Sequence, residues 1–222
     1  MSERDLPPLS ELRAELLRVA QTPNLAERTL EVVAIVEHVA APMRIHPVVV
    51  GGMAVYFWTA SDAFLTHDID VVMEVPELLE IKLAELGFAR SADGRHWALE
   101  GTDVFLEAPS SHLDDGVLVV EVALPSGRTA KVLSRVDILM DRLDEFQATG
   151  HEVVGRQILA LLGGMPQDEL VELETRAPAR RVTQILAAMR STSREVSAGG
   201  EIPASDEMHE IARTALRAEY SG

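Results

Sequence analysis

The sequence contains no cysteine, no long run of apolar residues and comparatively few basic residues. Without cysteine, the chain can form neither disulfide bonds nor zinc sites built on thiolates. No stretch reaches the roughly 18 consecutive apolar residues that a membrane-spanning helix requires. The charged opening MSERDLPPLSELRAELL lacks the apolar core of a secretory signal peptide. We therefore expect a soluble, cytoplasmic protein.

The shortage of positive charge argues against one class of function. Acidic residues number 36 and basic residues 20, which gives a formal net charge of −16 at pH 7. A general duplex-binding protein presents a basic face to the phosphates, so this class is not expected. The remaining composition, 47% hydrophobic and 25% charged, is that of a globular protein. A length of 222 residues suits one domain with an extension, or two small domains.

The spacing of apolar residues predicts three regions along the chain. These are an N-terminal helical extension (1–43), an α/β core (44–133) and a C-terminal helical region (134–222). In the core, strands are expected at 45–50, 69–75, 95–99, 103–108, 117–124 and 129–133, and helices at 53–59 and 76–86. Two helices are expected within 9–41, and others at 134–148, 151–162, 166–176, 178–190 and 205–219, with a linker at 191–204. The predicted fold class is α/β (α+β), a small mixed sheet flanked by helices.

Two glycines, Gly51 and Gly52, stand between a predicted strand and a predicted helix. Glycine lets backbone N–H groups approach an anion closely, and the start of a helix adds partial positive charge. Such a turn can bind phosphate without a basic side chain. The alternative is an ordinary tight turn with no ligand, because glycine serves turns freely.

Two aspartates, Asp68 and Asp70, open the strand that follows. Alternate residues of a strand point to the same face, so the two carboxylates converge. Like charges this close repel each other, and a divalent metal ion between them is the usual solution. The alternative is a pair of solvated turn residues. The apolar run that begins at Ile69 indicates a buried strand and favours the metal site.

A third carboxylate is expected to complete such a site. The strand predicted at 103–108 carries Asp103 and Glu107 on one face. If this strand runs antiparallel to the strand of Asp70, its C-terminal end lies beside the two aspartates. Glu107 stands at that end and is the preferred candidate, with Asp103 as the second choice. The alternative is that Glu107 is an ordinary surface residue, as most glutamates are.

These residues together resemble a known superfamily. The stretch VVVGGMAVYFW, followed by LTHDIDVVMEV, resembles the nucleotidyltransferase superfamily, whose fold is that of DNA polymerase β. Its motif is a hydrophobic residue before Gly–Gly or Gly–Ser, then an acidic pair hDx[DE]h. The form seen here is similar to AbiEii-type toxins and to a neighbouring family of uncharacterised bacterial nucleotidyltransferases. The segment AKVLSRVDILMDRLDEFQATGHEVVGRQILALL also resembles that neighbouring family, so that the likeness covers roughly residues 30–164.

The resemblance implies roles for five residues already singled out. Gly51 and Gly52 match the glycines of the phosphate loop. Asp68 and Asp70 match the carboxylates that bind Mg²⁺ or Mn²⁺, and Glu107 matches the third carboxylate. The implied chemistry is a two-metal transfer in which an acceptor hydroxyl attacks the α-phosphorus of an NTP and pyrophosphate departs.

The resemblance also assigns two further nucleotide-binding residues and shows two departures. Thr66 matches a Ser or Thr that contacts the nucleotide phosphates, and Arg142 falls where AbiEii-type proteins keep a lysine for the triphosphate. The family commonly has arginine two residues before that Thr, whereas this chain has Phe64. The spacing of 15 residues between Gly52 and Asp68 is also slightly long.

Two functional hypotheses remain at this point. The first is an active nucleotidyltransferase that modifies a hydroxyl of RNA, protein or a small molecule; a toxin-like role would add a cognate antitoxin protein as partner. The second is a catalytically silent relative that binds a nucleotide or a partner protein. The intact glycine pair and the two aspartates favour the first hypothesis, and Phe64 favours the second.

Arginines give the C-terminal region a local basic character. An RNA acceptor could contact these side chains, but the simpler interpretation is a solvated helix face. The arginines concerned are Arg176, Arg180, Arg181, Arg190 and Arg194.

Overall fold

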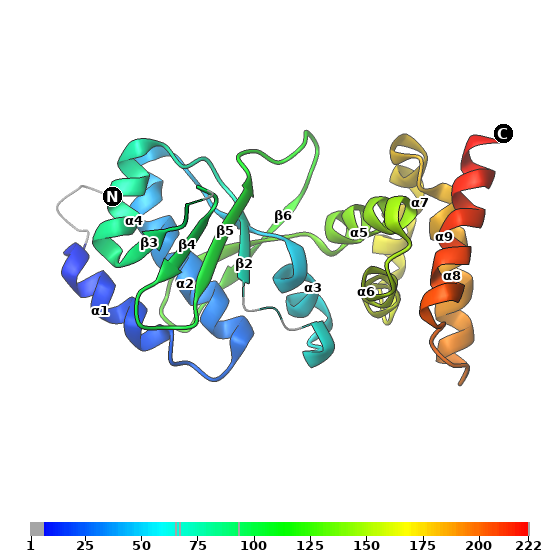
Figure 1. The fold of residues 1–222 in the computed structure, drawn as a ribbon, viewed down its shortest axis with the longest axis horizontal. Helices are drawn as coiled ribbons and strands as arrows, with labels where there is room; N and C mark the ends of the chain where they lie inside the picture. Colours follow the sequence, from blue (N-terminus) through cyan, green and yellow to red (C-terminus); the bar gives the residue numbers. More distant parts are fainter. Residues whose placement is uncertain (1–6, 65, 67, 93, 222) are drawn as a thin grey trace. The chain divides into compact units, whose positions relative to one another are not determined.

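The computed structural model describes residues 7–64, 66, 68–92 and 94–221, and the chain divides into two compact units (Figure 1). The first unit comprises the chain up to Phe57 together with Asp62–Leu133, and the second comprises Trp58–Ser61 and the chain from Ser134 onward. The first unit contains a sheet with helices, and the second is helical. The predicted α/β fold class is therefore confirmed.

The sheet of the first unit is mixed. Within the described residues it has seven strands in the order β3-β4-β5-β2-β1-β7-β6. The pairs β1–β7 and β2–β5 are parallel, and the other neighbours are antiparallel. The strands are β1 (Val48–Val49), β2 (Asp68–Val72), β3 (Phe88–Arg90), β4 (His96–Leu99), β5 (Phe105–Ser110), β6 (Val119–Ala123) and β7 (Thr129–Leu133).

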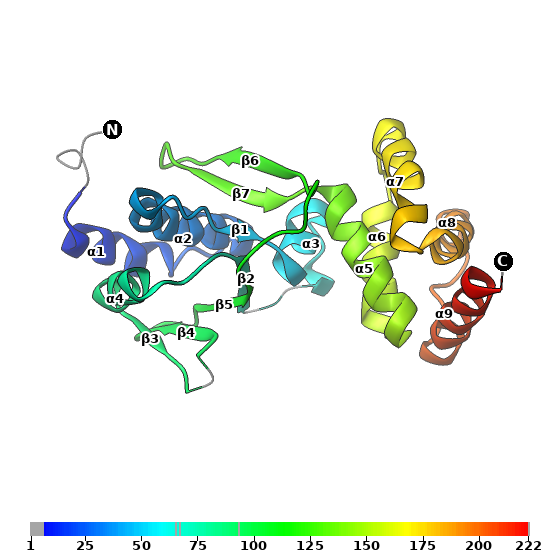
Figure 2. The same ribbon diagram turned by 90° about the horizontal axis from the view of Figure 1, so that it is seen from above.

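Four α-helices accompany the described part of this sheet. They are α1 (Leu9–Val19), α2 (Leu25–Ala40), α3 (Gly51–Thr59, which continues into the second unit) and α4 (Glu77–Leu86), with the short 3₁₀ helices η2 (Ala41–Met43) and η3 (Asp62–Phe64). The side chain of Asn24 caps α2 by accepting a hydrogen bond from the backbone N–H of Glu27. Helix α2 contacts β7, and α4 contacts β3 (Figure 2).

One face of the sheet forms the core of the first unit. Strand alternation directs every second side chain to this face. The side chains there exclude nearly all solvent, as Leu106 shows with 0% exposure. Five of these residues, one from each of five neighbouring strands, are Trp97, Leu106, Val71, Val49 and Val132. The residues between them point to the opposite face, which is more open.

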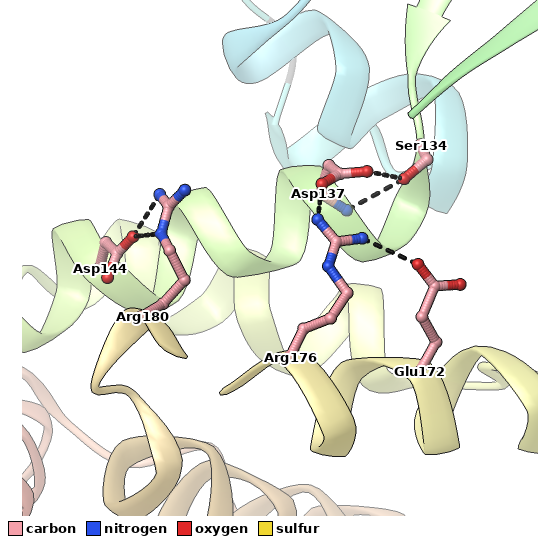
Figure 3. Close-up of polar contacts among 6 residues, drawn as sticks. All are labelled: Ser134, Asp137, Asp144, Glu172, Arg176 and Arg180. Carbon is pink, nitrogen blue, oxygen red and sulfur yellow. Dashed lines mark hydrogen bonds and ion pairs between the residues drawn. The ribbon is translucent and has the colours of Figure 1, made fainter. Parts of the chain in front are cut away.

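The second unit packs its helices around apolar side chains. Its helices are α5 (Arg135–Thr149), α6 (Glu152–Leu162), α7 (Gln167–Arg180), α8 (Thr183–Ser197) and α9 (Ser205–Tyr220). Ser134 caps α5 by accepting from the backbone N–H of Asp137, and it donates its own hydroxyl hydrogen to the Asp137 side chain. That carboxylate also accepts a hydrogen bond from the Arg176 guanidinium of α7, so one buried acidic group joins two helices (Figure 3).

Several predicted boundaries in the second unit were wrong. The expected linker at 191–204 is partly helical, since α8 continues to Ser197. The hydroxyl of Thr192 is bonded to the carbonyl of Ala188, so this polar side chain is accommodated within the helix. The sequence also predicted that one helix ends at 176 and the next begins at 178. Instead α7 continues to Arg180 with Pro178 in its last turn, and it ends where Arg181 adopts a left-handed conformation. No helix in the described ranges is both long enough and apolar enough to span a membrane.

Candidate functional site

Strands β2 and β5 bring two of the predicted carboxylates together. Asp70 pairs in register with Glu107, and Asp68 pairs with Phe105. The strands are parallel, so the assumption of an antiparallel pair was wrong. Glu107 nevertheless lies level with Asp70, because these two positions are paired in the observed parallel register. Neighbouring strands are about 4.8 Å apart, which places the two backbones within reach of one small ligand.

Asp103, the second choice for the third carboxylate, has a different role. It precedes β5 and forms an ion pair with Arg28 of α2, at 3.2 Å between Nη1 and Oδ1. The Arg28 guanidinium also donates to the backbone carbonyl of Ala20. Asp103 therefore helps to fasten α2 to the start of β5.

The carboxylates lie on the open face of the sheet. Residues that are level on neighbouring strands share a face, so the registers define two short rows across β4, β5 and β2. Their side chains are exposed or half-buried, whereas Ile69, between the two aspartates, is buried. The first row consists of His96, Glu107 and Asp70, and the second of Ala98, Phe105 and Asp68.

Gly51 lies directly against the Asp70 carboxylate. A Cβ atom at position 51 would be only 2.0 Å from Oδ2 of Asp70, which no real structure tolerates. Gly51 also has a φ of +60°, a left-handed conformation that side chains disfavour. The backbone N–H of Val50 donates to the carbonyl of Asp70 at 2.9 Å and ties this turn to β2. Glycine is therefore required here for both space and conformation.

Gly52 provides the corresponding space for Thr66. A Cβ atom at position 52 would be 2.7 Å from Cγ2 of Thr66. The Thr66 hydroxyl in turn donates to the backbone carbonyl of Asp68 at 3.1 Å. Both glycines belong to the first turn of α3, where unpaired N–H groups give a partial positive charge. An acidic side chain, a threonine and a helix N-terminus thus adjoin one another.

Phe64, the departure from the family pattern, is a core residue. It ends the 3₁₀ helix η3, and only 8% of its surface is exposed. The chain therefore has a buried aromatic ring where the superfamily commonly has an arginine. Phosphate handling by an arginine at this position is excluded.

His96 adjoins the candidate site, although no sequence pattern singled it out. Its Nε2 lies 3.1 Å from Oε2 of Glu107 on the neighbouring strand β5. The register follows from the turn that joins β4 to β5, in which Leu99 N–H donates to the Val104 carbonyl and Gly101 has a φ of +77°. Counting outward from this turn pairs 96 with 107, so Gly101 was the signal that could have found it.

The donor set can be compared with what a magnesium ion requires. Within the ranges that the structure describes, no group of three or more histidine, aspartate or glutamate side chains is arranged to hold a metal. Magnesium is usually held by one or two carboxylates together with substrate phosphates and water, and not by a complete protein cage. Asp70 and Glu107 are level on neighbouring strands, and Gly51 leaves room for the Asp70 carboxylate, so these two residues are the candidates for that smaller number of ligands. The full set with Asp68 stays a prediction.

Arg142 lies in the second unit, on α5. Its guanidinium is paired with two carboxylates of the same helix, Asp141 at 2.6 Å and Glu145 at 2.8 Å. Only 16% of the side chain is exposed. A contact between Arg142 and the nucleotide stays a prediction.

Three of the C-terminal arginines also have carboxylate partners. Arg176 of α7 reaches Asp137 and Glu172, and these contacts raise its pKa above the ordinary value, with the Asp137 hydrogen bond as the largest cause. Arg180 donates from Nε to Asp144 of α5 at 2.9 Å (Figure 3). A third arginine, Arg190, pairs with Glu174. These guanidinium groups connect helices and are not a bare cationic surface.

Two solved structures are similar to this one. The first is the crystal structure of an antigenic nucleotidyltransferase-like protein from Paracoccidioides brasiliensis, with a TM-score of 0.46, 19% identity, and coverage of 67% of this chain and 88% of that chain. The second is the solution structure of the antibiotic-resistance factor ANT(2'')-Ia, with a TM-score of 0.37, 15% identity, and coverage of 96% and 94% respectively. No protein-family model and no curated protein matches the chain. Such distant likenesses carry no functional argument, so the case for an activity rests on the residues themselves.

Proposed function

We propose that the chain is a magnesium-dependent nucleotidyltransferase that moves an NMP group from an NTP to an acceptor hydroxyl. One observation carries this proposal: the Asp70 carboxylate lies between Glu107 on the next strand and Gly51 at the start of α3. A carboxylate pair beside a helix N-terminus supplies the two kinds of group that a metal–triphosphate complex requires.

The glycine turn supplies the phosphate contacts in this proposal. The first N–H groups of α3 lack helical partners and can donate to phosphate oxygens, and the helix dipole favours the negative charge. The absence of a side chain at Gly52, which is buried, lets Thr66 lie directly against the turn, and in this proposal the Thr66 hydroxyl contacts the phosphates. In this proposal an acidic protein can therefore hold a triphosphate at this turn even though position 64 carries Phe64 in place of a basic residue.

The carboxylates perform the remaining tasks. Asp68, Asp70 and Glu107 would hold Mg²⁺ or Mn²⁺, which supplies charge neutralisation and alignment of the α-phosphate when bound. In this proposal Glu107 would also accept the proton of the attacking hydroxyl. Arg142 is assigned to the triphosphate only by the family resemblance.

The finer identity of the enzyme is proposed from the resemblance to AbiEii-type and neighbouring nucleotidyltransferases. A role like that of the AbiEii-type toxins would make RNA the acceptor and a cognate antitoxin protein the partner. A small molecule or a protein hydroxyl is the other acceptor class. The charge of −16 favours an acceptor that does not require a broad basic surface.

The alternative is a catalytically silent module that binds a nucleotide or a partner protein. Phe64 favours this alternative, because the chain buries an aromatic ring where the superfamily commonly has a phosphate-binding arginine. A module that binds a nucleotide would retain NTP binding and lack turnover, whereas one that binds a partner protein would lack both.

The two proposals are separated by a pair of measurements on the full chain. The melting temperature is recorded with each of the four NTPs, with and without Mg²⁺, and pyrophosphate release is then followed with candidate acceptors. The enzyme is expected to show Mg²⁺-dependent stabilisation by at least one NTP and pyrophosphate release. Stabilisation without release with RNA, protein and small-molecule acceptors would favour the silent module. No stabilisation by any NTP would overturn the enzyme and the nucleotide-binding module, and would leave only a module that binds a partner protein.

A further inference from the structure

His96 and Glu107 form a cross-strand pair on the open face of the sheet. The two residues are direct neighbours in the antiparallel β4–β5 register, and Nε2 lies 3.1 Å from Oε2. The side chains are 34% and 22% exposed, so the contact is partly shielded from water. At this separation an N–H on Nε2 can donate to Oε2, because an ionised carboxylate only accepts hydrogen bonds.

The position of His96 is set by the buried face of β4. Trp97 and Leu99 are almost completely buried and hold the strand in register against the core. Slipping by one residue would bring Trp97 onto the open face, at a large cost in apolar burial. The turn at Gly101 closes the same hairpin. The β4–β5 hairpin thus fixes the imidazole beside Glu107.

We propose that His96 is the positioning residue for Glu107, an inference that rests on the proposed function. A carboxylate has two oxygens, so Glu107 can accept from His96 through Oε2 and offer Oε1 to a cation or to the acceptor hydroxyl. Hydrogen bonds of this kind orient carboxylate ligands and restrict their rotation. Because β5 lies between β4 and β2, a Glu107 side chain held toward β4 through Oε2 would turn Oε1 toward the strand of Asp70.

The chain offers a matched control for this pair. His112 and Glu74 form a second histidine–glutamate pair in the first unit, at 2.7 Å between Nε2 and Oε1. These side chains are 72% and 57% exposed and follow the ends of β5 and β2. His112→Ala removes the same chemical group without touching Glu107.

The test compares His96→Ala, His96→Gln and His112→Ala. Glutamine keeps an N–H donor of similar reach, so it should restore part of the function, whereas a role in packing alone would not distinguish the two variants in this way. Binding of Mn²⁺ is measured by electron paramagnetic resonance in the presence of a non-hydrolysable NTP analogue, a readout that needs no turnover. NMP transfer is measured separately as kcat and KM.

We expect His96→Ala to weaken Mn²⁺ binding and to lower kcat by about 10- to 100-fold with little change in the KM for NTP. His96→Gln should recover most of both quantities, and His112→Ala should match the unaltered protein. Asp70→Asn is included to separate two kinds of failure. If Asp70→Asn abolishes Mn²⁺ binding while His96→Ala changes neither quantity, the role of His96 is overturned and the proposed function stands. If Asp70→Asn leaves Mn²⁺ binding intact, the proposed function itself fails.

Discussion

Gly51 is the residue at which the backbone and the candidate site approach each other most closely. Its absent side chain leaves room for the Asp70 carboxylate, and its φ of +60° starts α3 at the right place. Both properties concern the same atom, because a Cβ would clash with Oδ2 and would also disfavour the backbone conformation. The geometry of this single position therefore couples folding to the site.

Gly51→Ala should reduce both stability and nucleotide binding. The new methyl group must displace the Asp70 carboxylate, so Mg²⁺–NTP stabilisation should be lost, and backbone strain adds about 1–2 kcal/mol. Denaturant unfolding and the NTP-induced shift in melting temperature measure the two effects. Gly127→Ala is the control: its φ is +81°, and no atom of the described residues lies within 4 Å of the added Cβ. A Gly51→Ala protein that binds Mg²⁺–NTP normally would make the glycine pair an ordinary turn.

A second residue-scale contact makes stability depend on pH. Glu15 of α1 accepts two hydrogen bonds of 2.7 Å from Arg128 at the β6–β7 turn, and this partner lowers the pKa of Glu15. Because the folded pKa lies below the unfolded one, the unfolded chain takes up the proton first as the pH falls. The contribution is complete above about pH 4.3 and is lost as the pH falls through the folded pKa.

Glu15→Gln should therefore lower the free energy of unfolding at pH 7 by about 1–3 kcal/mol and flatten its fall in acid. Urea unfolding between about pH 7 and pH 3 measures this dependence. Glu11→Gln, on the exposed side of the same helix, should leave the acid slope unchanged. An equal acid slope in Glu15→Gln and the unaltered protein would rule out this ion pair as its source.

At the scale of elements, the sequence predicted those whose signals are local. β7 was predicted at its observed bounds, because polar and apolar residues alternate in Thr129–Leu133 and the turn residues Ser126-Gly127 precede it. β3 was missed, since it has three residues and only Phe88 is buried. The glycine turn and the carboxylate pair of β2 were also readable from local spacing. The direction of β5 relative to β2 was not, because it depends on contacts between distant segments.

His96 illustrates the same limit within the site. A histidine followed by Trp97 can point to either face of a sheet, and only the β4–β5 register shows which carboxylate it meets. The sequence contained the turn glycine that sets this register, but the contact between His96 and Glu107 could be inferred only once β4 was known to pair with β5. Residues that share one face of a strand are therefore predictable, whereas contacts between strands require the fold.

Close helix packing in the second unit gives a prediction at the element scale. A Cβ at Gly155 of α6 would lie 2.7 Å from the sulfur of Met208 and 2.9 Å from the ring of Phe146. Gly155→Val should therefore overpack this contact and lower the free energy of unfolding by about 1–3 kcal/mol. Ala160→Val, at a half-buried position of the same helix, controls for helix propensity. Equal unfolding free energies for the two variants would contradict the close packing.

At the scale of the whole molecule, charge and site have to be reconciled. The protein carries a net charge of −16, and an NTP is itself strongly anionic. Long-range repulsion therefore opposes binding, and a divalent cation at the carboxylates removes much of it. The predicted site residues, apart from Arg142, lie in the first unit. The proposal therefore requires the N-terminus of α3 and the carboxylates of this unit to bind the metal and the nucleotide.

The central claim is tested most directly by calorimetric titration of each NTP, with and without Mg²⁺, into the unaltered protein, Asp70→Asn and Asp115→Asn. Asp115 is an exposed turn residue and controls for the loss of one negative charge. We predict Mg²⁺-dependent NTP binding in the unaltered protein and in Asp115→Asn, and affinity at least about tenfold weaker in Asp70→Asn. The melting temperature of Asp70→Asn should be equal or higher, because one of two neighbouring like charges is removed. A lower melting temperature with unchanged NTP affinity would contradict the metal–nucleotide site.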